Sequence, residues 1–352
     1  MAERWAVATG NWSATGTWNG GTLPDIGDDV YANGFTVTVD SNRTANTVRT
    51  TAGTTAVAGG GFTLSNGITL TLSGSGGNAI AGSTTCITYS GTSGNSATIE
   101  GNPTGSSTTG SRHGATNTST GTLNITGNPT GGGSSSSFGV NNNSTGTVNV
   151  TGSPAAGAGS ASSGTRNVST GTINITGNVT GNSSGMAAYW AGGGGTVTGT
   201  VTGGSSSGVS GVQNAGSGTV AIVGSAVGGS AANANGVLNS GSGTTTISGN
   251  ATGGSNATAY GASNTGAGTL TIVGKATSAT APAVNGAVAS TLTSVGSAET
   301  GTDCIHPLNG KVVFANLSSA TYGIRNSSAT LETLSVSTST KNIFSPPAIF
   351  GA

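Results

Sequence analysis

A seven-residue phrase recurs along this chain at a nearly constant interval, and it constrains the fold more than any other feature. Gly121-Thr-Leu-Asn-Ile-Thr-Gly127 returns as Gly146-Thr-Val-Asn-Val-Thr-Gly152 and as Gly171-Thr-Ile-Asn-Ile-Thr-Gly177, and weaker copies continue to position 274. The leading glycines lie at positions 121, 146, 171, 195, 218, 243 and 268, so the steps are 25, 25, 24, 23, 25 and 25 residues. A period this steady indicates a repeat architecture.

Apolar residues alternate with polar ones inside each phrase, which predicts a short strand with one buried face. A strand of about five residues cannot bury that face alone, but it can do so when stacked on the next repeat. We therefore predict an all-β, single-chain parallel β-solenoid with one coil per 25 residues and nine to eleven coils. Two interior rows are expected: Leu123, Val148, Ile173, Val197, Val220 and Leu270, beside Ile125, Val150, Ile175, Ile222, Ile247 and Ile272.

A second phrase, Gly-x-x-Asn, keeps step with the first. Its asparagines are Asn117, Asn142, Asn167, Asn214, Asn239 and Asn264, and similar segments end at Asn285, Asn309 and Asn326. Successive copies would stack at the inter-strand spacing of about 4.8 Å. Stacked amides can hydrogen-bond along the axis, so this row is interpreted as a structural ladder.

The irregular segments around the repeats suggest four regions. Residues 1–50 form an N-terminal cap, 51–100 irregular first coils, 101–275 the regular solenoid, and 276–352 irregular C-terminal coils with an apolar tail. Three of the four tryptophans fall in the first region, and bulky aromatics suit the closure of an open solenoid end. Tyr189-Trp-Ala191 stands where a segment like Val237-Leu-Asn239 is expected, which predicts an outward aromatic pair or a local bulge.

The aromatic residues at both ends also allow a docking interpretation, which remains open beside the cap. Binding energy at protein interfaces concentrates in buried aromatic residues. The candidate partner-docking residues are Trp5, Trp12, Trp18, Tyr31, Phe344 and Phe350.

Charge is sparse and balanced, with nine basic and nine acidic residues in 352. Positions 101–298 contain no acidic residue and only three basic ones, Arg112, Arg166 and Lys275. No basic stripe exists, so nucleic-acid binding is not expected. No apolar run reaches transmembrane length and no secretory h-region is visible, so we expect no membrane insertion and synthesis in a cytoplasm.

Catalytic patterns are weak throughout. The regular coils offer no pair of carboxylates of the kind that glycoside hydrolysis needs. Asp25, Asp28 and Asp29 fall in a turn that favours local hydrogen bonding. The triplet Glu299, Asp303 and His306 lacks a nucleophile pattern, and His113 is expected at a surface corner. No zinc spacing is present, so no catalytic residue, metal or cofactor is assigned and we expect a non-enzymatic protein.

The segment Trp18-Asn-Gly-Gly-Thr-Leu-Pro-Asp-Ile-Gly-Asp-Asp-Val-Tyr-Ala-Asn-Gly-Phe-Thr-Val-Thr-Val-Asp40, followed by Gly/Ser/Thr-rich coils, resembles β-helical structural proteins of tailed bacteriophages, as does Gly310-Lys-Val-Val-Phe-Ala-Asn-Leu317. The resemblance implies a virion component, either a capsid-decorating protein or a tail fibre or spike, which contacts other virion proteins and host surface glycans. Many relatives are trimers, so a homotrimer is expected.

Two other classes remain open. A β-helical bacterial adhesin would need an export signal. An ice-binding solenoid would use repeated Thr-x-Thr, present at Thr120-Gly-Thr122 and in the next two coils, but placement at corners would not make a flat face.

Overall fold

The computed structural model describes two compact units, Met1–Gly177 (unit 1) and Asn178–Ala352 (unit 2). The residues that it describes are 2–49, 61–73, 78–79, 87–105, 111–133, 135–230, 232–255, 259–279, 283–286, 291–300, 305–306, 310–319, 324–325, 331–339 and 343–344. At 78–79 and from 286 onward the description is confined to the backbone.

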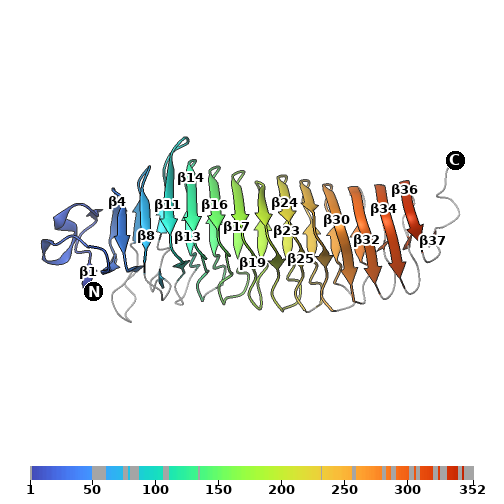
Figure 1. Cartoon of the computed structure of the whole chain (residues 1–352), viewed down its shortest axis with the longest axis horizontal. Coiled ribbons are helices and arrows are strands. Elements are labelled where there is room, and N and C mark those ends of the chain that lie inside the picture. The colour runs from blue at the N-terminus through green and yellow to red at the C-terminus, as the bar shows by residue number, and fades with distance from the viewer. Residues whose placement is uncertain are drawn as a thin grey trace. The chain divides into compact units, whose positions relative to one another are not determined.

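Unit 1 stacks its strands in chain order in two main parallel sheets (Figure 1). The long-strand sheet contains β5 (Arg43–Ala45), β8 (Thr69–Leu72), β11 (Ser96–Glu100), β14 (Thr122–Thr126), β16 (Thr147–Thr151) and β18 (Thr172–Thr176). The short-strand sheet contains β2 (Gly10–Asn11), β4 (Thr36–Val39), β7 (Gly61–Leu64), β10 (Ile87–Tyr89), β13 (Ala115–Asn117), β15 (Val140–Asn142) and β17 (Thr165–Asn167).

Smaller elements complete unit 1. A three-stranded parallel sheet joins β1 (Glu3–Trp5), β3 (Asp29–Tyr31) and β6 (Thr47–Arg49). A two-stranded pair joins β9 (Asn78–Ala79) and β12 (Pro103–Thr104). Two short 3-10 helices follow β2, η1 (Thr15–Thr17) and η2 (Asn19–Gly21).

Unit 2 repeats the arrangement and adds a third short strand to several coils. The long-strand sheet contains β21 (Gly195–Thr198), β24 (Thr219–Val223), β27 (Thr244–Ile247), β30 (Thr269–Ser278), β32 (Thr291–Thr300), β34 (Gly310–Ser319) and β36 (Leu331–Ser339). The short-strand sheet contains β20 (Ala188–Trp190), β23 (Val212–Asn214), β26 (Val237–Asn239), β29 (Ala262–Asn264), β31 (Val284–Gly286) and β33 (Ile305–His306).

The third strands of unit 2 are β19 (Val179–Thr180), β22 (Val201–Thr202), β25 (Ala226–Val227) and β28 (Ala251–Thr252). β30 pairs with both β27 and β28, so from this coil onward the two adjacent strands are continuous. β35 (Ile324–Arg325) and β37 (Ile343–Phe344) form a final parallel pair.

The predicted parallel β-solenoid is therefore confirmed, with about 10 stacked coils of about 25 residues. Burial explains why the phrase folds this way: in β14, β16 and β18 the apolar positions are buried and the polar ones face outward. Each buried Leu, Ile or Val contributes about 1.5–3 kcal/mol relative to an exposed one. No helix in the described part of the chain is long and apolar enough to span a membrane.

The two interior rows are buried as predicted, with one correction of register. Val197 aligns with Ile222 rather than with Val220, so it belongs to the second row and Gly195 takes its place in the first. The reason is that Gly195-Thr-Val-Thr-Gly199 is two residues shorter than its siblings, which removes one apolar position. Thr245 occupies the first row in a later coil and is completely buried.

Glycine closes each strong phrase for a steric reason. Gly127 and Gly152 have φ of 145° and 147°, in the region that side-chain-bearing residues avoid. A Cβ on Gly152 would overlap the carbonyl oxygen of Gly127 in the preceding coil. The corner thus requires glycine for both its backbone angle and the close approach of stacked coils.

Trp12 and Trp18 of the N-terminal region fill the solenoid interior. Trp12 and Trp18 are 0% and 1% exposed, their rings pack edge to face at 5.2 Å, and Trp12 also contacts Phe62 at 5.8 Å. The Trp18 indole donates to the Trp12 carbonyl at 2.8 Å. The cap interpretation fits this packing. Three of the predicted docking residues, Trp12, Trp18 and Tyr31, are buried in this packing, whereas docking itself stays a prediction.

Two further expectations need correction. Trp190 does not point outward: it is fully buried and aligned with Asn214, while its neighbour Tyr189 is half-buried. Asn285 does not continue the asparagine row, because Gly286 aligns with Asn264 and Asn285 aligns with Ser263. Asn309, Asn326, Asp303 and Phe350 lie outside the described residues, and for Glu299, His306 and Phe344 only the backbone is described.

Candidate functional site

The Gly-x-x-Asn asparagines of unit 1 form a buried row in the short-strand sheet. Asn117 aligns with Asn142, which aligns with Asn167, and each is fully buried. Asn117 Nδ2 donates to Asn142 Oδ1 at 3.2 Å. In addition, Asn142 Nδ2 donates to the carbonyl of Gly146 at 2.9 Å, a bond within one coil that fixes the corner between its two strands. The row therefore holds coils together and shapes their corners.

Unit 2 contains the same row, and one coil departs from it. Asn214, Asn239 and Asn264 align, and the Nδ2 atoms donate to the corner carbonyls of Gly218, Gly243 and Gly268 at 3.1, 3.2 and 2.9 Å. Trp190 occupies the equivalent position before Asn214, and its buried indole nitrogen has no hydrogen-bond partner. In this coil, packing of the buried indole takes the place of the hydrogen bonds that an asparagine amide makes in the other coils.

A second array, which sequence reasoning did not identify, lies on the outer face of the long-strand sheet of unit 1. Asn149 Nδ2 donates to Asn124 Oδ1 at 3.0 Å, and Asn174 Nδ2 donates to Asn149 Oδ1 at 3.1 Å. Threonines flank these asparagines on both sides. The resulting outer grid consists of Thr122, Asn124, Thr126, Thr147, Asn149, Thr151, Thr172, Asn174 and Thr176. Its signal was present in the phrase, because all nine outward residues repeat identically while the inward ones vary between Leu, Ile and Val.

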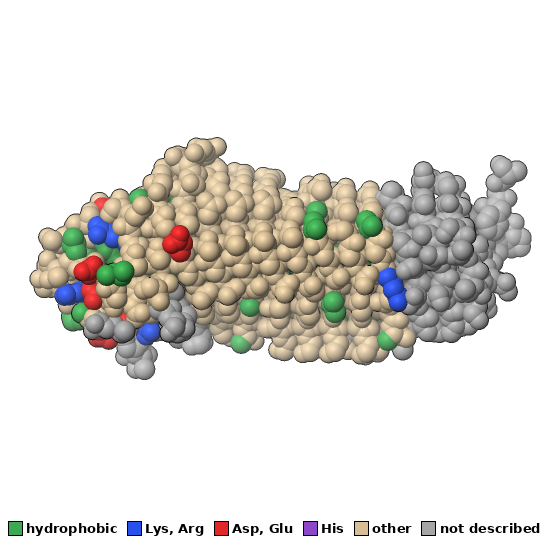
Figure 2. Space-filling view, viewed as in Figure 1, with side chains coloured by type: hydrophobic (Ala, Val, Ile, Leu, Met, Phe, Trp, Pro, Cys, Tyr) green, Lys and Arg blue, Asp and Glu red, His purple; other side chains and the backbone are tan. Residues whose placement is uncertain are grey.

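Charged side chains are concentrated at the N-terminal end of unit 1 (Figure 2). Two apolar side chains are exposed there, Val7 at 48% and Ile26 at 69%. Trp5 is half-buried, so it alone among the four N-terminal aromatic candidates retains surface. Val7 and Ile26 were missed from the sequence because neither is aromatic and no periodic pattern surrounds them. Val7, Ile26 and Trp5 are among the apolar side chains of the cap that a partner can contact, together with the half-buried Leu23 and Phe35.

The three clustered aspartates of the cap have structural partners. Asp28 accepts hydrogen bonds from the backbone of Ala2 at 3.0 Å and of Asp25 at 3.1 Å, and lies 3.5 Å from Arg4. Burial raises the pKa of Asp28, but the hydrogen bonds and Arg4 outweigh burial and hold that pKa below its ordinary value. Asp29 accepts from Asn46 and from Thr47, both at 2.8 Å. These carboxylates fix the first turns of the chain.

One cluster of ionisable side chains lies in the regular coils. The His113 ring stacks on Phe138 at 4.9 Å with an interplanar angle of 13°, and its Nδ1 accepts from the Phe138 backbone at 3.2 Å. The Arg166 guanidinium lies 4.8 Å from the centre of the Phe138 ring. Burial, reinforced by the positive charges of Arg166 and Arg112, lowers the pKa of His113 to about 4. His113 is thus a half-buried residue just before β13, and its lowered pKa keeps the ring neutral near pH 7.

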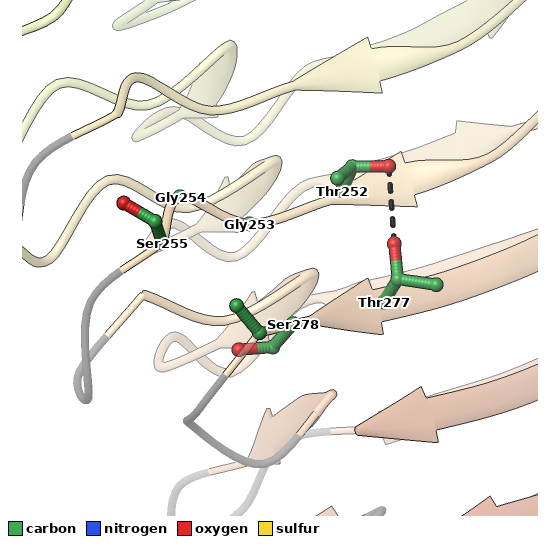
Figure 3. A pocket seen from close by; sticks show the side chains of 7 residues that line it. Thr252, Gly253, Gly254, Ser255, Thr277 and Ser278 are labelled. Atoms are coloured by element: carbon green, nitrogen blue, oxygen red, sulfur yellow. Dashed lines mark hydrogen bonds between the residues drawn. The ribbon is translucent and has the colours of Figure 1, made fainter. Parts of the chain in front are cut away.

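An open hollow of about 330 Å³ lies in unit 2 between two neighbouring coils (Figure 3). It is lined by Thr252, Gly253, Gly254, Ser255, Thr277, Ser278 and Ala279. On one side of the hollow, the Thr277 hydroxyl donates to the Thr252 hydroxyl of the preceding coil at 3.1 Å. The Ser255 and Ser278 hydroxyls donate to the carbonyls of Ser230 and Ala259, both at 2.7 Å. The lining contains no acid, base or activated nucleophile.

Across the described residues, no group of three or more His, Cys, Asp or Glu side chains is placed to hold a metal ion. Comparison of the chain with protein-family models, with curated proteins and with solved structures found no match.

Proposed function

We propose that this chain is a non-enzymatic structural protein of a bacteriophage virion, exposed on the particle as a capsid-decorating protein or as part of a tail fibre or spike. The observation that carries the proposal is the pairing of an aromatic-filled cap with coils held by uncharged amide rows. The resemblance of residues 18–40 to phage β-helical proteins supports the same assignment. Such coils suit a neutral spacer or a surface for weak contacts with host glycans.

The absence of acidic residues from positions 101–298 supports a non-enzymatic role, because glycan cleavage on a β-helix needs carboxylates near the bound sugar. The purified protein should release no oligosaccharide from host capsule or cell-wall polysaccharide. Release of sugar would oppose this part of the proposal, and Glu299, Asp303 and His306 would then be the first residues to substitute.

The direct test of the proposal is mass spectrometry of phage particles purified through a density gradient. The chain should band with the major capsid and tail proteins at a fixed ratio. A chain that is abundant in the infected lysate but absent from the particle fraction would oppose the assignment.

Attachment to the particle is assigned to the cap. Deletion of residues 1–20 would remove Trp12 and Trp18 from the interior, so a loss of incorporation would not separate anchoring from misfolding. Exposed side chains give a cleaner test. Val7→Ser with Ile26→Ser should reduce incorporation, whereas the matched control Val273→Ser, at a position 57% exposed in unit 2, should not. Normal incorporation of the double variant would remove the anchoring role.

We also propose a homotrimer, the common state among the proteins that the chain resembles. Sedimentation equilibrium should give three times the chain mass of 33.1 kDa. A monomer at micromolar concentration would remove this part of the proposal.

One observation favours a second function, binding to ice. The threonines of the outer grid lie on a strand face and not only in corners, which removes the geometric objection drawn from the sequence. Rows repeat at about 4.8 Å along the axis, and along each strand two threonine hydroxyls lie four residues apart with an asparagine amide between them. Thermal hysteresis of the purified protein would support this function, and its loss in Thr151→Lys would assign it to the grid.

A further inference from the structure

The sequence of the regular coils supplies positive charge but no negative charge. Positions 101–298 contain no Asp or Glu, yet Arg112 and Arg166 both lie in unit 1 near His113, whose protonation both disfavour. The one ion pair among the described residues joins Arg4 and Asp28 in the cap. An arginine retained where the chain supplies no carboxylate is available to an external anion.

The Arg166 side chain is held in place without using its hydrogen-bond donors. It projects from β17 and its guanidinium lies over Phe138, whose ring also stacks on His113. Within the described part of the chain the guanidinium makes no hydrogen bond and no ion pair. A guanidinium has five N–H donors in a planar fork that matches an oxyanion. Stacking on Phe138 orders this fork before any ligand arrives, which lowers the entropy cost of binding.

A neighbouring amide is also unsatisfied. Asn141 is the register partner of Arg166 in the adjacent strand, and it is only 1% exposed. Its Oδ1 is enclosed and has no hydrogen-bond partner. An amide oxygen only accepts hydrogen bonds, so in this orientation it does not pair with an anion. Half a turn about the terminal side-chain bond exchanges the amide oxygen and nitrogen, so Asn141 can donate to an anion.

We propose that Arg166 and Asn141, with Phe138 as a platform, form a binding site for an oxyanion, the carboxylate or sulfate group of an acidic sugar. This inference rests on the proposed function, in which the coils are exposed on a particle and contact host glycans. The site would specify which glycans they contact. Neutral sugars offer the guanidinium no charge partner and should bind less well. Arg112 adds to the positive field but is itself only 8% exposed, so it acts at a distance.

The experiment uses the full chain and three probes: sodium sulfate, sodium glucuronate and glucose. Calorimetric titrations are run with ionic strength held constant by chloride. Sulfate and glucuronate should bind saturably, and glucose should not. Arg166→Gln should weaken binding at least tenfold, whereas Lys275→Gln, which removes the other basic residue of the regular coils outside this cluster, should leave it unchanged. Equal losses of affinity in Arg166→Gln and Lys275→Gln would show that only net charge matters and would overturn the site. Unchanged affinity in Arg166→Gln would also overturn it.

Asn141→Asp provides a test that does not depend on a destabilised variant. A carboxylate beside Arg166 would occupy the guanidinium from within the chain. The variant should therefore melt at a higher temperature than the parent and should lose sulfate and glucuronate binding. Parental affinity in Asn141→Asp would contradict the assignment. These results are independent of particle association, so failure of the site and failure of the virion assignment can be told apart.

Discussion

The N-terminal cap and the regular coils of unit 1 reach stability by different means. The cap packs unlike residues against one another: Trp12 packs against Trp18 and against Phe62 of the first coils, and Asp28 is joined to Arg4 and to distant backbone groups. In the coils from β13 to β18, each residue stacks on a residue of the same kind in the next coil. Aliphatic side chains align inside, and amides align at the corner and on the outer face. A change in the cap should therefore act locally, whereas a change in a coil removes a member from a continuous row.

The largest expected effect comes from a charge placed inside a coil. Ile175→Asp buries a carboxylate without a partner, and we expect a loss of more than about 5 kcal/mol in the free energy of unfolding. Thr151→Ala, on the exposed side of the neighbouring strand, should change it by less than about 0.5 kcal/mol. Urea denaturation followed by circular dichroism measures both. Similar losses from the two variants would contradict the burial pattern.

Trp12→Ala tests whether damage to the cap stays local. Removal of this fully buried indole should cost about 4 kcal/mol. Hydrogen exchange should accelerate in β2, β4 and β7, while amides of β16 and β18 keep most of their protection. Uniform acceleration through unit 1 would show that cap and coils unfold as one cooperative unit, and the comparison would fail.

Acid should loosen the coils through His113. Its folded pKa of about 4 lies below the ordinary value of 6.5, so the neutral ring is the form that the fold favours. Stability is then complete above pH 6.5 and falls as pH drops towards 4, by about 3 kcal/mol at most. The nearby charges are Arg112 and Arg166, which both oppose protonation.

The matched control for this pH dependence is His113→Asn, which keeps an acceptor for the Phe138 amide but does not titrate. The difference in unfolding free energy between parent and variant should shrink as pH falls from 7 to 4. A constant difference would show that His113 does not protonate on unfolding in this range.

The smallest effect distinguishes the two amide rows. Asn142→Ala leaves the buried Asn117 amide without its acceptor and removes one of the two donors to the Gly146 carbonyl, which also accepts from the Thr172 backbone at 3.1 Å, and it should cost about 2 kcal/mol. Asn149→Ala in the same coil breaks comparable bonds on the outer face, where water can replace them, and should cost less than about 1 kcal/mol. Thermal melting of the two variants side by side provides the measurement. Equal costs would show that burial does not set the value of an amide row.

Periodicity made the coils predictable, because every copy repeats the same evidence for strand, corner and inward face. It gave the β-solenoid, the interior rows and the position of the asparagines. It could not give the register of Val197, since a shortened phrase can lose its residues at either end. Single events were harder still: Trp190 replaces an inward asparagine, and only packing decides that an indole fits there. The Arg166 cluster joins residues from three coils, so no local sequence pattern predicts it.

Antibody labelling of intact particles tests the central claim, a cap that anchors and coils that project, most directly. Gold-labelled antibodies against the 145–176 coil region should decorate intact particles in the electron microscope. Antibodies against residues 20–27, which contain the exposed Ile26, should label only dissociated particles, because a cap that anchors the protein would be covered on the intact particle. Labelling of the cap on intact particles, or no labelling by either antibody, would contradict the account.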